Sequence, residues 1–362
     1  MSTILILSNR GDLTKEDEHL VYTDYHGKRT RILPFKTEHL LIAGNVTITG
    51  DAMKMILKNE LPVTYLTQGG MFLGRIVYQD GKNVFLRQKQ FLLLENKKKV
   101  LEIAKSIVAG KIKNQLSFVQ RIKRSRGSKE EFEASVKSIK QALKEVSKCT
   151  SLTSLRGIEG NAARHYFAAY NCNFLAEWAE FGKRTQNPPQ TNVNAVLSFL
   201  YTLTCHYVTT AIESQGLDTM AGNLHELNYG RDVLTFDLME EFRVPMADTL
   251  TCHLFNKNIL EKKDFHTISF SSESKKLPVS TIEQFHQGED DENEGKPVEA
   301  IYLNETGIKK VFEAFIEKVN SEVLYVPAKK RLSFAEIMVE QAKMYKRVIL
   351  GEEADYTPFY YR

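Results

Sequence analysis

The hydrophobic period of this chain changes once, near residue 86, and that change constrains the fold more than any other feature. Up to about residue 80 the chain holds short runs rich in β-branched side chains, separated by the turn signals NRGD, YHGK and QGG. One short helix, GDAMKMILKNE, interrupts these strands, with Thr49 or Asp51 as its cap. From residue 86 the apolar residues recur at helical spacing with lysines opposite. The pattern predicts an α+β protein.

The change of period also predicts two domains. We expect a small β-sandwich-like domain with mixed strand pairing over residues 1–84 and a larger, mainly α-helical domain over residues 85–362. Helices are predicted at about 86–124, 129–148, 155–181, 191–215, 234–258, 306–320 and 330–350. The segment 268–300 contains GEDDENEGKP and is unusually acidic, which predicts an exposed, mobile loop.

Composition places the chain among ordinary globular proteins. Apolar residues make up 42% and charged residues 26% of its 362 residues. No stretch resembles a secretion signal, and no run approaches the length of a membrane span, so we expect no membrane partner. The four cysteines are widely separated and form no C-x-x-C pair, which indicates reduced, mostly buried thiols in a cytoplasmic protein.

Positive charge is concentrated in one part of the chain. Residues 87–148 hold 17 Lys or Arg against six Glu and no Asp, although the whole chain has a net charge of only +4. The densest clusters are Lys97, Lys98 and Lys99, and then Arg121, Lys123 and Arg124. Such a block favours a surface that faces a polyanion. A solvated helical face with mobile lysines is the alternative, and the charge pattern alone does not separate the two.

One segment, AGNLHELNYGRDVLTFDLMEEFRVP, places a histidine shortly before an apolar helix that carries three carboxylates, Asp237, Glu240 and Glu241. His225 and Glu240 would lie about 22 Å apart on an unbroken helix, but LNYGRD contains turn-forming residues that allow the chain to reverse. Asp237 and Glu240 share a helix face, whereas Glu241 points about 100° away. His225 and Glu240 could therefore bind one metal ion. Alternatively, the histidine is structural and Glu240 pairs with Arg243.

A third potential ligand lies in SLRGIEGNAARHYFAAY. Glu159 is flanked there by Gly157 and Gly160, and glycines inside a helix suggest the close approach of a ligand or of another backbone. The alternative is a glutamate that the helix dipole favours in the first turn.

These segments, in this order, carry a family resemblance that spans nearly the whole chain. The sequence resembles the CRISPR-associated adaptation integrases, the larger of the two near-universal spacer-acquisition proteins. The segments that carry the resemblance are ITGDAMKMILKNELPVTYLTQGGMFLGRI, LRGIEGNAARHYFAAY, NPPQTNVNAVLSFLYTLT, GLDTMAGNLHELNYGRDVLTFDLMEEFRVPMADTL, IYLNETGIKKVFEAF and DYTPFYYR.

The resemblance implies a metal-dependent DNA endonuclease and integrase, in which the 3′-OH of a captured spacer attacks a phosphodiester at the edge of the CRISPR repeat. It implies that Glu159, His225 and Glu240 are metal ligands and that Asp237 is an acid near the site. Two carboxylates and an imidazole suit Mg²⁺ or Mn²⁺, which keep positions open for phosphate and water. The chain departs from the commoner family pattern at Thr219, which replaces a proline, and at Asn223, which replaces an aromatic residue.

Further DNA contacts and partners are expected on the same grounds. Besides the two basic clusters, we expect DNA contacts from Arg156, Asn194, Tyr201 and Arg243. For Asn194 and Tyr201, and for Ser198 on the same helix, packing in the core is the alternative. The implied partners are double-stranded DNA (prespacer and CRISPR repeat), a second copy of the chain bound through the β domain, and the small second Cas adaptation protein.

Two other classes of protein compete with this interpretation. A non-catalytic DNA-binding scaffold would keep its metal residues for structure, but the complete Glu–His–Glu set argues against it. A helical RNA-binding protein would need aromatic stacking platforms near the basic block, where residues 87–148 hold only Phe91, Phe118 and Phe132.

Overall fold

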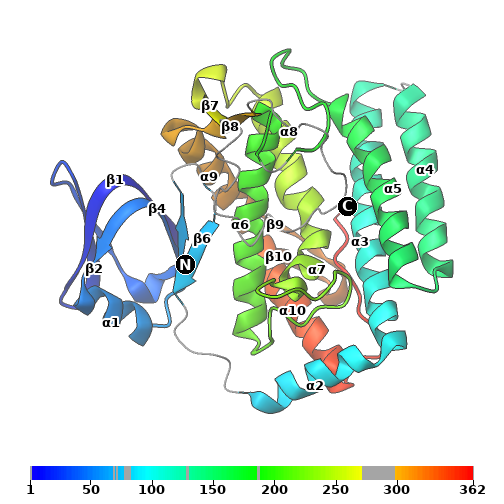
Figure 1. Cartoon of the computed structure of the whole chain (residues 1–362), viewed down its shortest axis with the longest axis horizontal. Helices are drawn as coiled ribbons and strands as arrows, with labels where there is room; N and C mark the ends of the chain where they lie inside the picture. Colours follow the sequence, from blue (N-terminus) through cyan, green and yellow to red (C-terminus); the bar gives the residue numbers. More distant parts are fainter. Residues whose placement is uncertain are drawn as a thin grey trace. The chain divides into compact units, whose positions relative to one another are not determined.

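The computed structural model describes residues 2–67, 70, 72–76, 83–127, 130–185, 188–270 and 298–361 (Figure 1). The chain divides into two compact units. The first combines Met1–Asp80 with Lys263–Ile316, and the second combines Gly81–Lys262 with Glu317–Arg362. The first is built around strands and the second is mainly helical, so the predicted α+β class is confirmed.

Six strands of the first unit form one sheet in the order β3-β2-β1-β4-β5-β6. Their bounds are β1 (Ser2–Glu16), β2 (His19–Asp24), β3 (Arg29–Ile32), β4 (Thr37–Ile48), β5 (Val63–Leu66) and β6 (Phe72–Ile76). β4 runs parallel to both β1 and β5, whereas the other neighbours are antiparallel, which confirms the predicted mixed pairing. Helix α1 (Gly50–Lys58) follows β4, and the Thr49 side chain accepts a hydrogen bond from Ala52 N as its cap.

The NRGD segment, which we predicted as a turn, lies inside the long strand β1. Its turn-forming residues accommodate a β-bulge. Ser8 pairs with Gly44 and Gly11 pairs with Val46, so β1 has one residue more than β4 between these two pairs. A Cβ on Gly11 would lie 2.6 Å from the Tyr22 ring on the neighbouring strand, so glycine leaves room for that ring. Glycine can therefore mark a close contact within a strand as well as a turn.

The first unit also contains an antiparallel pair, β7 (Phe265–Phe270) and β8 (Val298–Leu303), followed by the start of helix α9 (Glu305–Asn320). The predicted loop 268–300 therefore has paired strands at both ends, with Ile268 opposite Ala300. The loop prediction rested on the acidic run between them and passed over the apolar and β-branched residues of FHTISF and VEAIYL. The rest of that predicted loop, including its acidic run, lies outside the described residues.

The second unit is a bundle of helices, in which α3, α4 and α5 pack against one another (Figure 1). Its helices are α2 (Val84–Glu95), α3 (Lys97–Arg126), α4 (Glu130–Lys148), α5 (Leu152–Asn171), α6 (Asn192–Ser214), α7 (Val233–Phe242), α8 (Thr249–Asn256) and α10 (Phe334–Leu350). A hairpin of β9 (Glu322–Tyr325) and β10 (Lys330–Ser333) precedes α10. α6 is the one described helix long and apolar enough to cross a membrane, and most of it is buried inside the structure.

Four predicted helices have different bounds in the structure, and the one predicted over 155–181 already ends at Asn171. The helix predicted from residue 86 is divided at Asn96, whose side chain caps α3 by accepting a hydrogen bond from Lys99 N. The helix predicted over 234–258 contains a π-helical segment, Arg243–Asp248, between α7 and α8. Pro245 lies in that segment and has no N–H to donate, which disfavours a continuous α-helix there. The helix predicted from residue 330 begins after Ser333, which forms a capping box with Glu336.

Candidate active site

Glu240 lies at the centre of a buried polar site on α7. Its side chain is 2% exposed, and its two oxygens contact different cations: Oε1 lies 3.0 Å from an Arg243 nitrogen and Oε2 lies 2.7 Å from Lys111 Nζ. Burial alone would raise the pKa of Glu240, but the positive charges of Arg243 and Lys111 hold it well below its usual range. Glu240 is therefore an anion at neutral pH despite its burial.

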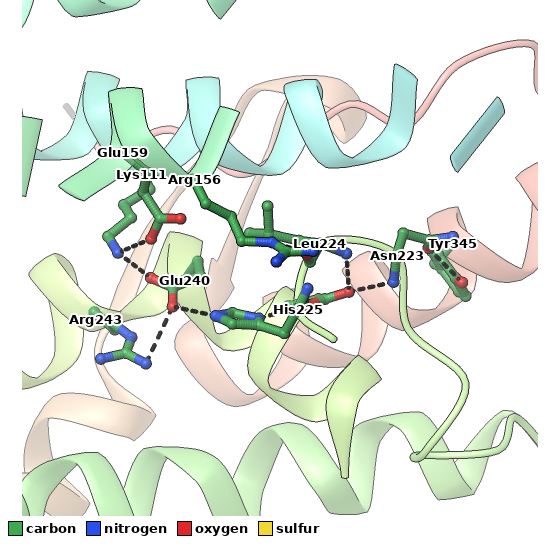
Figure 2. A network of polar contacts seen from close by, with 10 residues as sticks. Lys111, Arg156, Glu159, Asn223, Leu224, His225, Glu240, Arg243 and Tyr345 are labelled. Atoms are coloured by element: carbon green, nitrogen blue, oxygen red, sulfur yellow. Dashed lines mark hydrogen bonds and ion pairs between the residues drawn. The ribbon is translucent and has the colours of Figure 1, made fainter. Parts of the chain in front are cut away.

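Lys111 joins Glu240 to a second carboxylate (Figure 2). It reaches into the site from α3, and its Nζ lies 2.5 Å from Oε1 of Glu159 on α5. Burial alone would lower the pKa of Lys111, but the charges of Glu159 and Glu240 outweigh it and raise the pKa. The ammonium is therefore charged, and it lies between two carboxylates that come from different helices.

His225 approaches Glu240 from the loop that connects α6 to α7. Its Nδ1 lies 2.7 Å from Asp237 Oδ1, and its Nε2 lies 3.9 Å from Glu240 Oε1. Because a carboxylate only accepts hydrogen bonds, Nδ1 carries a proton and donates it, and Nε2 is the ring nitrogen that faces Glu240. The turn predicted at LNYGRD is confirmed: Gly230 has a φ of 71°, and Arg231 N donates to Asn228 O.

Asp237 braces the loop that carries His225. Its side chain is fully buried and accepts hydrogen bonds from three consecutive backbone N–H groups, at 2.5 Å from Asn223, 2.8 Å from Leu224 and 3.2 Å from His225. A Cβ on Gly222 would lie 2.6 Å from Asp237 Oδ2, so this approach requires glycine. The position of the imidazole therefore depends on Asp237 through both the ring and the backbone.

The two departures from the family pattern also stabilise this loop. Asn223 Oδ1 accepts a hydrogen bond from Tyr345 OH at 2.7 Å, which ties the loop to α10 (Figure 2). The Thr219 hydroxyl donates to Asp232 Oδ1 at 2.6 Å, close to the start of α7. Polar contacts thus stand at the two positions where the resemblance led us to expect a proline and an aromatic side chain.

A second buried network lies beside Arg243. Asp248, at the end of the π-helical segment, accepts hydrogen bonds from Tyr166 OH at 2.6 Å and Tyr201 OH at 2.7 Å. The Tyr201 ring lies 5.0 Å from the Arg243 guanidinium and 5.3 Å from that of Arg184. Burial raises the pKa of Asp248, although the two tyrosine hydrogen bonds oppose the rise. Through the Tyr201 ring, this network also contacts Arg243.

The structure places several of the expected DNA contacts inside the protein. Asn194 is fully buried, and its side chain bonds the backbone of Phe181 and Lys183 as well as Arg184. Tyr201 is 5% exposed and donates to Asp248. For both residues the alternative, packing in the core, accounts for the observed contacts. Ser198 accepts a hydrogen bond from Arg184 in the same region.

Arg156 has a bracing contact of its own. Its Nε donates to Leu224 O at 3.1 Å, and its guanidinium pairs with Glu226. Arg156 therefore contacts the residue before His225 and the residue after it. Since Arg156 and Glu159 lie one turn apart on α5, this helix supplies a carboxylate to the site and a support to the histidine loop.

The two basic clusters lie at opposite ends of α3, a helix of 30 residues. Lys97 and Lys98 are exposed at its start, where Lys99 pairs with Glu102 and Asp355. At the other end, Arg121 lies 5.0 Å from the Tyr361 ring, Lys123 pairs with Glu133, and Arg124 is exposed. At 1.5 Å per residue, roughly 36 Å separates the clusters, so they form two patches and not one.

The donor atoms of the site have the chemistry of a hard-cation site. Among the residues that the structure describes, no three His, Cys, Asp or Glu side chains come close enough together to hold a metal ion as they stand. However, Glu159 and Glu240 already contact one cationic atom, Lys111 Nζ, and the Nε2 of His225 faces Glu240. Two carboxylate oxygens and an imidazole nitrogen fit Mg²⁺ or Mn²⁺.

The fold and the site define a class of protein with a mixed N-terminal sheet, a helical unit and a largely buried group of two glutamates and a histidine. This chain belongs to the Cas1 family, because the family model described as CRISPR associated protein Cas1 matches residues 4–284. A curated relative from Moorella thermoacetica, named CRISPR-associated endonuclease Cas1 1, is 29% identical over 368 residues, covering 100% of this chain and 99% of the relative. A second relative, from Thermus thermophilus and named CRISPR-associated endonuclease Cas1 3, is 29% identical over 361 residues, covering 99% of this chain and 97% of the relative.

Solved structures show the same fold. A Cas1 protein from Thermotoga maritima has a TM-score of 0.76 at 21% identity, covering 97% of each chain. A casposase bound to its integration product has a TM-score of 0.81 at 20% identity, covering 100% of this chain and 95% of the other. The family resemblance recognised in the sequence is confirmed.

Sequence reasoning missed Lys111, although its position carried a signal. On α3 the buried residues Ala104, Ile107 and Phe118 are spaced so that Lys111 falls on the same apolar face. A lysine at such a position needs a buried partner or must extend its ammonium to water. Asp248 was missed because nothing in MADTL distinguishes a buried acid from a surface one.

Proposed function

We propose that this chain is a metal-dependent DNA endonuclease and integrase of CRISPR adaptation, which joins the 3′-OH ends of a spacer to the CRISPR repeat by phosphodiester transesterification. The observation that carries the proposal is the convergence of Glu159 and Glu240 on the Lys111 ammonium, with Nε2 of His225 facing Glu240. The names of the curated relatives, which are CRISPR-associated endonucleases, support the reaction class.

The proposed cofactor is Mg²⁺ or Mn²⁺, held by Glu159, His225 and Glu240. When bound, such an ion would polarise the phosphoryl oxygen and stabilise the departing 3′ oxygen. Asp237 keeps the proton on Nδ1 of His225, so that Nε2 remains available as a ligand. Arg243 supplies a fixed positive charge beside Glu240, which would favour a bound phosphate.

The chain itself supplies no nucleophile in this proposal, because the attacking group is the 3′-OH of the DNA. Burial of Cys149, Cys205 and Cys252 supports this, because a buried thiol cannot reach a substrate. Burial raises the pKa of Cys252 to about 12, so its thiol stays protonated at neutral pH.

The proposed partners are double-stranded DNA, a second copy of this chain and the small second Cas adaptation protein. A structure titled as a Cas6-RT-Cas1–Cas2 complex includes a chain that resembles this one with a TM-score of 0.79 at 20% identity, 36% of that chain being covered. We assign the homodimer contact to residues 1–84, where β3 and β6 are the edge strands of the six-stranded sheet. With DNA as substrate, we place the protein in the cytoplasm.

A strand-transfer assay tests this function. The full-length chain is incubated with a prespacer duplex and a plasmid that carries the repeat, with Mn²⁺ or with EDTA, and with or without the small partner. We expect joined product only with metal, and none from Glu159→Gln, His225→Ala or Glu240→Gln. A protein that binds DNA but joins none under any of these conditions would instead be the non-catalytic scaffold.

A further inference from the structure

We propose that Lys111 is an internal competitor for the metal ion: its ammonium holds Glu159 and Glu240 together before the ion binds, and it must release at least one of them when the ion arrives. This inference rests on the proposed function, because it takes the two carboxylates to be metal ligands.

Distances and burial show why an internal cation is needed. Lys111 Nζ lies 2.5 Å from Glu159 Oε1 and 2.7 Å from Glu240 Oε2, and these three side chains are 11%, 13% and 2% exposed. Two carboxylates that lie close together and are largely shielded from solvent would repel each other without a positive charge between them. Lys111 supplies that charge, but a metal ion would need the same carboxylate oxygens. The ammonium and the ion therefore compete.

Arg243 is the other cation on Glu240, and its surroundings show why it is not the competitor. It contacts Oε1 of Glu240, whereas Lys111 bridges Glu240 and Glu159, and its guanidinium lies against the Tyr201 ring. A planar guanidinium stacked on a ring is held in one geometry, whereas an ammonium on a flexible four-carbon stem can move by rotation about its own bonds. Lys111 is thus the group that can be displaced.

Displacement would also give Lys111 a second role. An ammonium released from one carboxylate stays tethered to α3, beside the two carboxylates that would hold the ion. It would then bind a DNA phosphate as a point charge. Lys111 would weaken metal binding in the absence of DNA and strengthen DNA binding once the metal is present, which makes it a positioning residue that couples the two events.

The test measures Mn²⁺ binding directly, by calorimetric titration of the full-length protein without DNA. Lys111→Met and Lys111→Gln remove the charge, and methionine also suits the apolar face of α3. We expect both variants to bind Mn²⁺ about tenfold or more tightly than the unchanged protein, since the ion no longer displaces a charged hydrogen bond. Lys111→Arg, which keeps the charge, should stay near the unchanged value. Lys105→Gln, on an outer part of α3, is the matched control and should bind Mn²⁺ as before.

Melting in EDTA and in Mn²⁺ provides a second readout. We expect Mn²⁺ to raise the melting temperature more in Lys111→Met than in the unchanged protein. Variants that unfold in EDTA but refold with Mn²⁺ would support the proposal, because the ion then replaces the ammonium. Variants that stay unfolded with Mn²⁺ would overturn it, as would folded variants with unchanged or weaker Mn²⁺ binding.

A failure of the proposed function gives a different result. If Glu159→Gln and the unchanged protein bind Mn²⁺ equally well, the metal site itself is wrong and the role of Lys111 fails with it. If Glu159→Gln abolishes binding while Lys111→Met and Lys111→Gln leave it unchanged, only the competitor role is wrong.

Discussion

Glu240 and Glu241 are neighbours on α7, yet their buried side chains belong to different networks. Glu240 contacts Lys111 and Arg243, whereas Glu241 accepts hydrogen bonds from Tyr356 OH at 2.7 Å and Phe359 N at 2.5 Å. The helix that carries the central carboxylate of the site is therefore anchored on its other side to the C-terminal segment.

The first prediction concerns this anchor. Glu241→Ala should lower the free energy of unfolding by about 2–3 kcal/mol, because it leaves the buried donors of Tyr356 and Phe359 without their acceptor. Chemical denaturation measures the loss, and limited proteolysis should show faster cleavage near residue 356. Glu352→Ala, at an exposed position nearby, is the control. Equal stability of Glu241→Ala and the control would contradict the anchoring role.

The second prediction separates support of the histidine from metal ligation. Asp237→Asn keeps the size of the side chain, but its amide cannot accept all the hydrogen bonds that the carboxylate accepts from the loop and from Nδ1 of His225. We expect strand transfer to fall about 10- to 100-fold without being abolished. Initial rates at saturating Mn²⁺ measure the effect, with Glu240→Gln as the fully inactive comparison. Complete inactivity of a folded Asp237→Asn would assign Asp237 a more direct role.

The third prediction concerns pH and the sheet of the first unit. Burial lowers the pKa of His39 to about 4, and its Nε2 lies 3.0 Å from Thr64 Oγ1 on the next strand. The unfolded chain binds a proton near pH 6.5 but the folded chain does not, so stability is full above that pH and falls as the pH drops toward 4. The free energy of unfolding falls by up to about 3 kcal/mol through this group. We expect the free energy of unfolding, measured by chemical denaturation from pH 7 to pH 4.5, to fall less in His39→Gln than in the unchanged protein. His26→Gln, at an exposed position, should behave as the unchanged protein does.

The fourth prediction tests the two ends of α3 as DNA-binding patches. Neutralising Lys97, Lys98 and Lys99 should reduce the salt dependence of duplex binding. The slope of the logarithm of the binding constant against the logarithm of the salt concentration should become shallower by about 0.9 for each phosphate that the variant no longer neutralises. The same should hold for Arg121, Lys123 and Arg124. Fluorescence anisotropy from 50 to 200 mM salt, about the range over which such binding weakens strongly, measures the slope. Lys329→Gln with Lys330→Gln is the control, and slopes equal to the control in both variants would place the DNA path elsewhere.

The fifth prediction is the homodimer. Light scattering of the full-length chain at micromolar concentration should give a mass near twice 41.4 kDa. Leu73, on the edge strand β6, is 57% exposed, and Leu73→Lys should weaken a dimer that forms through this edge. This substitution is a better test than removal of residues 1–84, because residues 263–316 belong to the same compact unit and would be left without their support. A monomer for the unchanged protein would defeat the dimer proposal.

Residue spacing predicted the part of the site that lies close together in sequence. His225, Asp237 and Glu240 could be brought together from one turn signal and one helix period, and their contacts agree with that reasoning. Lys111 and Glu159 were harder to relate to each other, because their contact joins two helices whose packing no local pattern specifies. For Asn194 the sequence left DNA contact and core packing as alternatives, and its amide donates to the backbone of Phe181 and Lys183, contacts that no local pattern specifies.

The π-helical segment Arg243–Asp248 sets the rotational phase between two stretches of helix. Each residue in an α-helix advances the side-chain direction by about 100°, and a π-turn adds roughly one residue to the turn that it replaces. Arg243 and Asp248 both contact Tyr201 across this segment, so their alignment depends on how many residues separate them. Deleting one residue between Phe242 and Thr249 would rotate everything that follows away from its partners, even with every remaining side chain unchanged. The constraint that this segment imposes is therefore on its length.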